Sequence, residues 1–412
     1  MVTNPGRPAT QRSTARAATP CRRAMLGIPL LALLCAAGPL SAAQPETSGT
    51  GAPDTSRSVD LDATVIAGPL EFPWALAVLP DGRILITERP GRLRIVSSGK
   101  LVAAPVTGTP GVLFDGHGGL LDVLPARDFA ASRMVYLSYL HGTPKAAAMA
   151  VMRARLIGNA LSGASVIFES KPAVGRTDQI GGRLAWAPDG NLLVTLGDRF
   201  EMQRAQDLQD HHGKILRLRP DGSVPADNPF VGRTDTLPEI YSYGHRNPQG
   251  VVVVEDRIWA VEHGPQGGDE VNLIASGHNY GWPITTYGKN YDGTPIGIGP
   301  TAPGITPPLH YWVPSVAPSS MTLDRSHRAG ARDPKRFIIG TLAGQMLIRL
   351  TLGDRQGPAR EERMLIGKLG RIRNVASAPD GTVYLITDAP DASLYRLTMP
   401  PPAAPEQGAK SP

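Results

Sequence analysis

The sequence predicts an all-β protein, a six-bladed β-propeller built from four-stranded antiparallel blades. Short apolar runs of strand type, each bounded by turn residues, fill the middle of the chain. A sequence motif recurs in which Pro-Asp-Gly separates two such runs. Long helical periodicity is almost absent. The 412 residues include 46 Gly and 40 Pro, which supply many turns but are too few for a low-complexity chain.

Residues 1–43 have the composition of a signal peptide. They carry five arginines and no acidic residue, and the apolar run Met25–Leu40 leads to the small residues Ser41–Ala43, where cleavage is expected. Pro29 and Pro39 interrupt the apolar run, which is too short for a good membrane span. We therefore expect a periplasmic or secreted protein with no stable membrane anchor, exported by the general or the twin-arginine route.

Charge and cysteine content restrict the function of the mature chain. Without residues 1–43, 37 basic side chains face 36 acidic ones, so no cationic excess remains to bind nucleic acid. Both cysteines, Cys21 and Cys35, also lie in the signal segment. The exported domain is therefore expected to be stabilised by its core or by bound metal, without disulfides.

The rest of the chain divides into three parts by composition. Residues 44–60 are polar and rich in Pro, Gly and Ser, so we expect a flexible lead. Residues 61–399 contain the strand-like runs and form the propeller domain. Residues 400–412 are expected to be a disordered tail.

The number of repeats of the Pro-Asp-Gly motif predicts the number of blades. The motif is clear at Ala75–Glu88, Leu184–Gly197 and Val375–Asp388, and degenerate near residues 120–139, 249–263 and 321–342. Six units of about 55–60 residues match four-stranded blades with long loops. A large β-sandwich or several small β domains are the alternatives. Lys145–Leu156 is rich in alanine but is predicted to be a strand. In a propeller, the chemistry is expected in the long loops at one end of the axis.

Two pairs of residues offer cationic or mixed hydrogen-bonding groups. Arg246 and Asn247 lie side by side in Pro238–Gly250, where the arginine could bind carboxylate or quinone oxygens or could be a buried structural residue. Arg371 and Arg373 alternate along a predicted strand and therefore point to one face. Such a pair suits a ligand with several carboxylates, although two surface arginines would give the same pattern.

The segment Glu262–Pro283 carries candidate calcium ligands. Its Gly264–Gly268 stretch cannot form regular structure, so its carbonyl groups are free, and Asp269 and Glu270 are adjacent hard oxygen ligands. Ca²⁺ needs six to eight such oxygens. A solvated acidic turn is the alternative. The sequence contains no phosphate-binding loop, dinucleotide fingerprint, zinc-ligand spacing or serine-hydrolase elbow.

Together these segments resemble the soluble PQQ-dependent sugar dehydrogenases of the glucose/sorbosone dehydrogenase family, most closely its bacterial aldose sugar dehydrogenase branch. The resemblance runs in order from about Phe72 to Leu397. It includes PWALAVLPDGRILITERPGRLRIV, GGLLDVLPARDFAASRMVYLSY, AQDLQDHHGKILRLRPDGSVPADNPF, PEIYSYGHRNPQG and EHGPQGGDEVNLIASGHNYGWP. It implies an enzyme that binds PQQ and Ca²⁺, oxidises the C1 hydroxyl of an aldose sugar to a lactone, and passes electrons to a soluble acceptor.

The resemblance also implies roles for individual residues. Arg246 and Asn247 match residues on the quinone side of PQQ, and Arg371 and Arg373 match arginines that face its carboxylates. The carbonyls of Gly264 and Pro265 match ligands of the Ca²⁺ that holds PQQ. Glu270 and the Tyr280 carbonyl, with Asp269 as a further candidate, match a second, structural Ca²⁺ site.

Three positions depart from the family pattern. The family's base histidine is replaced by Gln179, which has no proton-accepting form near neutral pH, and a family glutamine is replaced by His117. A lysine that relatives commonly carry is Ala343 here. In one interpretation His117 is the base, Gln179 positions the hydroxyl and Asp178 helps to bind the sugar. In the other, the chain is an impaired or inactive ligand-binding propeller. A hydrolytic propeller of the lactonase type is a third possibility.

Overall fold

The structure is a computed structural model that describes residues 56–327, 334–352 and 359–402. The expected signal peptide, most of the lead and most of the tail lie outside these ranges. All described residues belong to one unit, residues 50–412. None of the helices in the described ranges combines the length and the apolar character needed to cross a bilayer.

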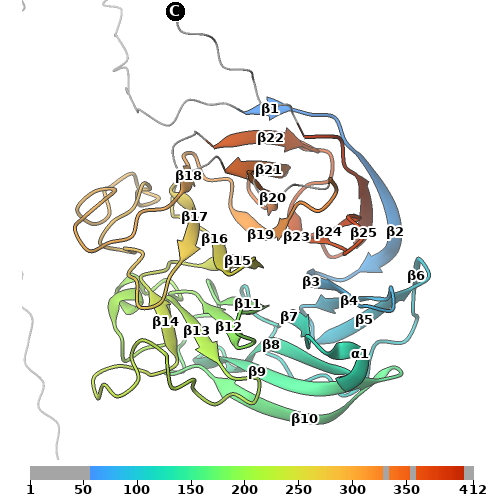
Figure 1. Ribbon diagram of the computed structural model, residues 1–412, viewed down its shortest axis with the longest axis horizontal. Helices are drawn as coiled ribbons and strands as arrows, with labels where there is room; N and C mark the ends of the chain where they lie inside the picture. The colour runs from blue at the N-terminus through green and yellow to red at the C-terminus, as the bar shows by residue number, and fades with distance from the viewer. Residues whose placement is uncertain (1–55, 328–333, 353–358, 403–412) are drawn as a thin grey trace, which may run out of the picture. The chain divides into compact units, whose positions relative to one another are not determined.

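The described strands form six sheets, as the sequence predicts (Figure 1). Each blade has four antiparallel strands, which follow chain order from the innermost strand outwards except that β2 is the fourth strand of the sixth blade. The blades, from the first to the sixth, are β3 (Pro73–Val78), β4 (Ile84–Glu88), β5 (Arg92–Ser97) and β6 (Lys100–Leu101); β7 (Leu120–Pro125), β8 (Met134–Thr143), β9 (Ala146–Ile157) and β10 (Ala160–Glu169); β11 (Gly181–Trp186), β12 (Leu192–Leu196), β13 (Lys214–Leu218) and β14 (Ile240–Tyr243); β15 (Pro248–Val254), β16 (Arg257–Glu262), β17 (Asp269–Ile274) and β18 (His310–Trp312); β19 (Pro318–Leu323), β20 (Lys335–Thr341), β21 (Leu347–Leu352) and β22 (Arg360–Met364); and β23 (Ile372–Ser377), β24 (Val383–Thr387), β25 (Ala392–Thr398) and β2 (Asp62–Leu70).

The ring of blades closes through the two ends of the domain. Each innermost strand contacts the next, and β23 of the last blade contacts β3 of the first. The N-terminal strand β2 pairs antiparallel with β25, so it completes the sixth blade before the chain enters the first (Figure 1). Because both termini contribute to one sheet, the ring cannot open at this blade without breaking that pairing.

The predicted flexible lead needs a correction at its C-terminal end. Arg57–Ser58 forms strand β1, which pairs parallel with β22 and adds a fifth strand to the fifth blade. Polar composition predicted no regular structure there, but the exposed edge of β22 offers backbone groups that β1 can pair with. The alanine-rich segment predicted to be a strand is β9. Helix in the described ranges is confined to α1 (Phe129–Ser132) and the 3₁₀ helix at Met202–Gln206.

The three clear Pro-Asp-Gly motifs form the hairpins between the first two strands of three blades. Leu79 donates to the Arg83 carbonyl at 2.8 Å, and the same bond recurs in the third and sixth blades. In each turn the aspartate side chain accepts from the backbone N–H two residues later, as Asp81 does from Arg83. Gly82 completes its turn at φ 82°, a conformation that strongly favours glycine.

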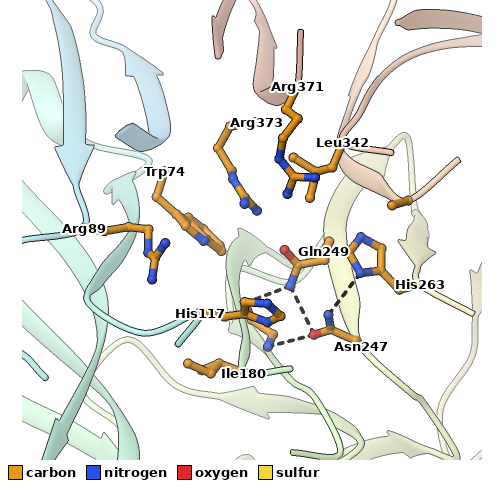
Figure 2. A pocket seen from close by; sticks show the side chains of 12 residues that line it. Trp74, Arg89, His117, Ile180, Asn247, Gln249, His263, Leu342, Arg371 and Arg373 are labelled. Carbon is orange, nitrogen blue, oxygen red and sulfur yellow. Dashed lines mark hydrogen bonds between the residues drawn. The ribbon is translucent and has the colours of Figure 1, made fainter. Parts of the chain in front are cut away.

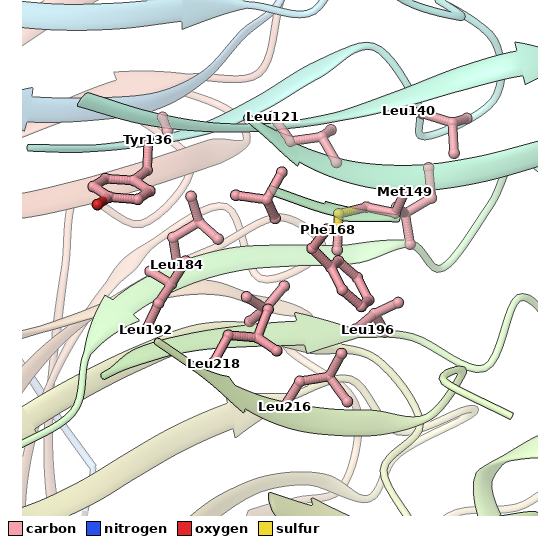
Figure 3. Close-up of a cluster of buried hydrophobic side chains, with 14 of the residues drawn as sticks. Leu121, Tyr136, Leu140, Met149, Phe168, Leu184, Leu192, Leu196, Leu216 and Leu218 are labelled. Atoms are coloured by element: carbon pink, nitrogen blue, oxygen red, sulfur yellow. The ribbon is translucent and has the colours of Figure 1, made fainter. Parts of the chain in front are cut away.

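The core lies between neighbouring blades, because each sheet buries one face against the next. Figure 3 shows this packing between the second and third blades, where Leu121 and Met149 face Leu184, Leu192 and Leu216. All five side chains are almost fully buried. Truncating such a residue to alanine typically costs about 2–5 kcal/mol.

One buried side chain connects all six innermost strands near the axis. Arg183 on β11 is 5% exposed and contacts a residue on every other innermost strand in the described ranges. Its partners are the ring of Trp74 (3.9 Å from Cζ to the centroid), Asp122 Oδ1 (3.7 Å), the Gln249 carbonyl (2.6 Å), the Ser319 carbonyl (2.9 Å) and the Arg373 carbonyl (3.5 Å). The guanidinium therefore supplies donors to carbonyls that face the centre of the ring.

Candidate active site

A cavity of about 140 Å³ is lined by residues from all six blades (Figure 2). The loop residues that line it precede the innermost strand or follow the second strand of a blade, so the ring geometry brings together positions that lie far apart in the sequence. The lining residues include Trp74 and Arg89 (first blade), His117 (second), Ile180 and Gly181 (third), Asn247, Gln249 and His263 (fourth), Ala317 and Leu342 (fifth), and Arg371 and Arg373 (sixth).

Two of the predicted cofactor-binding arginines form one side of the cavity. Arg371 Nε and Arg373 Nη2 both donate to Asp388 Oδ2, at 2.9 and 3.0 Å. Burial acts to raise the pKa of Asp388, but Arg373 and Arg371 outweigh it and lower the value to about 2. The prediction that both arginines point to one face is confirmed, and Asp388 is the residue that holds them together.

A further arginine, Arg89, lines the cavity and was missed by sequence reasoning. It follows β4 directly, in a segment that looks like an ordinary turn. Its guanidinium donates to the Gly118 carbonyl at 2.9 Å and to the Gly116 carbonyl. Burial lowers the pKa of Arg89 to about 10, which leaves it charged at neutral pH. The cavity lining therefore carries guanidinium groups from the first and sixth blades.

Gln179 is buried behind the cavity and interacts with Arg246. With the amide turned so that both of its ends are satisfied, its oxygen accepts from Arg246 Nη2 at 2.8 Å and its nitrogen donates to Asp198. Trp282 Nε1 also donates to Asp198, at 2.7 Å. Burial raises the pKa of Asp198 to about 6, against the opposing effect of Arg246. Asp198 is a second residue that sequence reasoning missed, since nothing in its own segment marks it.

Arg246 and Asn247 occupy neighbouring but different places. The Arg246 guanidinium lies between the rings of Trp282 and Phe200, with Cζ 5.3 and 5.8 Å from their centroids. Asn247 lines the cavity, and its Oδ1 accepts from the Gly181 N–H at 3.1 Å. Its amide nitrogen contacts His263 Nδ1 at 3.3 Å. Both side chains are thus held in place from several directions.

His117 is fixed in the cavity wall through both its backbone and its ring. Its N–H donates to the Thr177 carbonyl at 2.9 Å, and its Nδ1 accepts from the Gln179 N–H at 3.1 Å. Burial lowers the pKa of His117, while Asp178 opposes this and nearby arginines add to it. The acceptor role of Nδ1 requires a neutral ring. Because Nδ1 accepts a hydrogen bond, the ring proton lies on Nε2, which faces Asp178 Oδ1 at 3.6 Å.

The predicted calcium-binding loop is buried beside Arg246. The Gly264 carbonyl accepts from Arg246 Nη1, and its N–H donates to Asp269 Oδ1 at 2.8 Å. Pro265 is buried in the same loop and lines neither the cavity nor the smaller one beside it.

Asp269 is engaged by several hydrogen-bond donors, and its role as a metal ligand stays a prediction. Its carboxylate accepts from the N–H groups of Gly264, Val316 and Ala317 at 2.7–2.8 Å, and from the Ser315 hydroxyl. These donors occupy its lone pairs and join the calcium-loop region to the fifth blade. The sequence could not show this, because the donors Ser315, Val316 and Ala317 lie more than 40 residues away.

Glu270 faces a small cavity of about 10 Å³, roughly the room of one water or ion, and Tyr280 also lines it. Burial and the neighbouring Glu262 raise the pKa of Glu270 well above its ordinary value. Asn272 donates to both carboxylates, and its Oδ1 is buried with no hydrogen-bond partner in the described ranges. This set of oxygen atoms suits a hard cation.

Side chains alone do not form a metal centre here. Within the described residues, no group of three or more His, Cys, Asp or Glu side chains is placed to hold a metal ion. A cation at the Gly264 loop or beside Glu270 must therefore rely on carbonyl oxygens as well. Ala343, at the position where the family resemblance leads us to expect a lysine, is exposed and follows the lining residue Leu342.

Comparisons with known proteins agree with this architecture. The sequence model of the Glucose / Sorbosone dehydrogenase family matches residues 70–396. Aldose sugar dehydrogenase YliI of Escherichia coli is 38% identical over 335 residues, which cover 79% of this chain and 90% of that protein. A crystal structure of a glucose dehydrogenase aligns with a TM-score of 0.78 at 44% identity, over 82% of this chain and 100% of the other. The PQQ-bound form of an aldose sugar dehydrogenase from Streptomyces coelicolor gives a TM-score of 0.68 at 28% identity, over 82% and 98% of the two chains.

Proposed function

The chain belongs to the glucose/sorbosone dehydrogenase family of PQQ-dependent sugar dehydrogenases, and we propose that it is an exported, calcium-dependent enzyme that oxidises the C1 hydroxyl of aldose sugars to lactones. The observation that carries the proposal is the axial cavity, where Arg89, Arg371 and Arg373 present guanidinium groups. PQQ carries three carboxylates, and a cavity lined by arginines offers charge-assisted hydrogen bonds to such an anion.

The cavity residues fit PQQ in charge and in orientation. When bound, PQQ would supply the redox chemistry by accepting a hydride from C1 of the sugar. Arg371 and Arg373 would bind its carboxylates, and Asp388 holds the two guanidiniums in one orientation. Arg246, fixed by Gln179 and by two aromatic rings, would stabilise negative charge that develops on the quinone side. Asn247 would add a hydrogen bond from the cavity wall.

Two calcium sites are part of the proposal. The carbonyls of Gly264 and Pro265 would hold a Ca²⁺ at the cofactor, where Arg246 now satisfies the Gly264 carbonyl. Glu270 and the Tyr280 carbonyl would hold a structural Ca²⁺, which would neutralise the buried pair formed with Glu262. The unpartnered Asn272 Oδ1 supports this second site, because a buried acceptor without a donor can be satisfied by a cation.

Export is proposed from the signal peptide alone, since residues 1–43 lie outside the described ranges. N-terminal sequencing of protein recovered from the periplasm should begin at Gln44. An electron acceptor in solution would then reoxidise the cofactor.

A catalytically impaired ligand-binding propeller is the second candidate function. Gln179 favours it, because the amide is buried between Arg246 and Asp198 and has no proton-accepting form. The exposed Ala343 removes one cation from the cofactor's surroundings as well.

Steady-state turnover distinguishes the two candidates. The purified protein is incubated with PQQ, Ca²⁺, a reducible dye and a panel of aldoses, and the product is identified by mass spectrometry. The proposal predicts lactone formation that requires both PQQ and Ca²⁺. Absence of turnover with every aldose while PQQ remains bound would favour the impaired propeller. Calcium-dependent lactone hydrolysis without PQQ would instead indicate a hydrolytic enzyme.

A further inference from the structure

Oxidation of a C1 hydroxyl releases a proton, and the structure must provide a group to accept it. Gln179 cannot do so, because its amide has no basic form and its two ends are occupied by Arg246 and Asp198. Another group within reach of a sugar in the cavity is therefore required, if the proposed function is correct.

His117 is poorly placed for this role although its ring lines the cavity. A neutral imidazole accepts a proton only at its unprotonated nitrogen, which is Nδ1 here. That atom already accepts from the Gln179 N–H at 3.1 Å, and the His117 N–H donates to the Thr177 carbonyl. The nitrogen that remains free, Nε2, carries the proton and can only donate.

Asp198 is excluded by its position. It is 1% exposed and lies behind Gln179. Its carboxylate also accepts from Trp282 Nε1 at 2.7 Å and from the Phe200 N–H at 2.9 Å. A sugar in the cavity cannot touch it.

Asp178 has the opposite properties. Its side chain is 35% exposed, and Oδ1 lies 3.6 Å from Nε2 of His117, a cavity-lining residue whose side chain is 58% exposed. Asp178 thus lies next to the cavity lining. In the described ranges no side-chain or backbone donor forms a hydrogen bond with the carboxylate, so its lone pairs are open to a substrate hydroxyl.

A buried cation interacts with the charge of Asp178. Arg199 is 1% exposed, and none of its three guanidinium nitrogens has a hydrogen-bond partner in the described ranges. Among nearby charges, Asp178 is the one that most opposes the effect of burial on this guanidinium. Asp178 therefore offsets part of the cost of burying the Arg199 guanidinium, and a carboxylate group has the chemistry of a general base.

We propose that Asp178 is the proton acceptor of this enzyme, oriented by His117, in place of the histidine that relatives have at Gln179. The proposal rests on the proposed function. As the C1–H bond breaks, the hydrogen leaves as a hydride, with both electrons of that bond, and goes to the quinone cofactor. The O–H bond breaks with its proton going to an Asp178 oxygen, and the C1=O bond of the lactone forms. The neutral carboxyl then releases the proton to water, which its exposure permits. The ring of His117, whose Nε2 faces Asp178 Oδ1 at 3.6 Å, positions the carboxylate.

The test compares variants of the PQQ- and Ca²⁺-loaded protein. Asp178→Ala is expected to lower kcat by about 10²–10⁴-fold, the usual contribution of a general base, with PQQ affinity unchanged. Formate or acetate should restore part of kcat in Asp178→Ala and have no effect on the wild type. Asp256→Asn, in the exposed turn between β15 and β16, is the matched control and should keep full activity.

His117 variants separate positioning from catalysis. His117→Gln keeps a donor at the site and should change KM more than kcat. The proposal would be overturned if His117→Gln lost as much kcat as Asp178→Ala and if formate failed to rescue Asp178→Ala. A rise of two orders of magnitude in wild-type turnover on introducing Gln179→His would also overturn it, since that would show that the chain lacks a proton acceptor.

A readout without cofactor tests the tautomer directly. In ¹⁵N-histidine-labelled, cofactor-free protein, the two-bond ¹H–¹⁵N spectrum should show His117 neutral and protonated at Nε2, and Asp178→Asn should shift its Nε2 resonance. Protonation at Nδ1 would leave Nε2 free as a base and would overturn the proposal. If the wild type oxidises no aldose with PQQ bound, the proposed function fails; if it does and Asp178→Ala keeps full activity, only this inference fails.

Discussion

Replacing Arg183 by methionine removes the side chain that joins the six innermost strands. Methionine fills part of the same volume but donates no hydrogen bond. The Gln249 and Ser319 carbonyls, now 2.6 and 2.9 Å from the guanidinium, would lose their charged donor. Asp122, 7% exposed, would lose the cation that opposes the effect of burial on its pKa.

The magnitude follows from these contacts. Removing one partner of a buried ion pair costs about 3–5 kcal/mol, because the remaining charge stays buried without compensation. Each charged hydrogen bond lost costs about 1.5–3 kcal/mol, but the carbonyls share one donor group and their costs do not simply add. We expect the free energy of unfolding of Arg183→Met to fall by about 3–5 kcal/mol.

Urea denaturation of the cofactor- and calcium-free protein, followed by circular dichroism, measures this loss. With a slope of about 3 kcal/mol per molar urea, the midpoint should fall by about 1 M or more. Arg233→Met is the control, because Arg233 pairs with Asp235 at the surface, where both side chains are at least half exposed. It should change stability by less than about 0.5 kcal/mol. An Arg183→Met variant within about 1 kcal/mol of the wild type would refute the reasoning.

Three further predictions concern the cofactor, the cation and acid stability. Arg371→Gln should weaken PQQ binding by about ten- to a hundredfold, because one charge-assisted contact to a carboxylate is lost; an unchanged Kd in an absorbance titration would contradict the assignment of this wall to the cofactor. Glu270→Gln should abolish the rise in Tm that Ca²⁺ produces, whereas Asp269→Asn should lower Tm equally with and without Ca²⁺ in differential scanning fluorimetry; the reverse pattern would identify Asp269 as the ligand. The pKa of Asp388 falls from the ordinary 3.8 to about 2, so this carboxylate stabilises the fold above about pH 4 and the stabilisation, about 2 kcal/mol, is lost as the pH falls towards 2. Urea midpoints between pH 2.5 and 5 should therefore depend less on pH in Asp388→Asn, and identical slopes would show that the carboxylate does not contribute.

The fold could be predicted because its signals are local. A Pro-Asp-Gly turn between two apolar runs specifies a hairpin whatever surrounds it, and Leu79 and Arg83 pair as that motif requires. Side-chain alternation along a strand likewise placed Arg371 and Arg373 on one face. The count of repeats then gave the number of blades. The pairing of β1 with β22 was not predictable in this way, because Arg57–Ser58 carries no strand signal of its own.

The site was only partly predictable, since it is built from loops of six blades. Asp269 has the right chemistry for a metal ligand, but donors from the fifth blade occupy it. Arg89 and Asp198 carry no local signal and gain their importance only from what the ring places beside them. The exchange of histidine and glutamine between positions 117 and 179 was inferred from the resemblance to the family. Only the structure shows that His117 Nδ1 accepts a hydrogen bond.

The central claim, that this chain is a working PQQ-dependent sugar dehydrogenase, is tested most directly by one titration. Calcium-loaded, cofactor-free protein is titrated with PQQ while the cofactor absorbance is followed, and an aldose is then added to the same cuvette. We predict saturable binding, followed by bleaching of the oxidised cofactor within the first turnover. Binding without reduction by any aldose would contradict the claim of activity, and absence of binding would contradict the assignment of the arginine-lined cavity to PQQ.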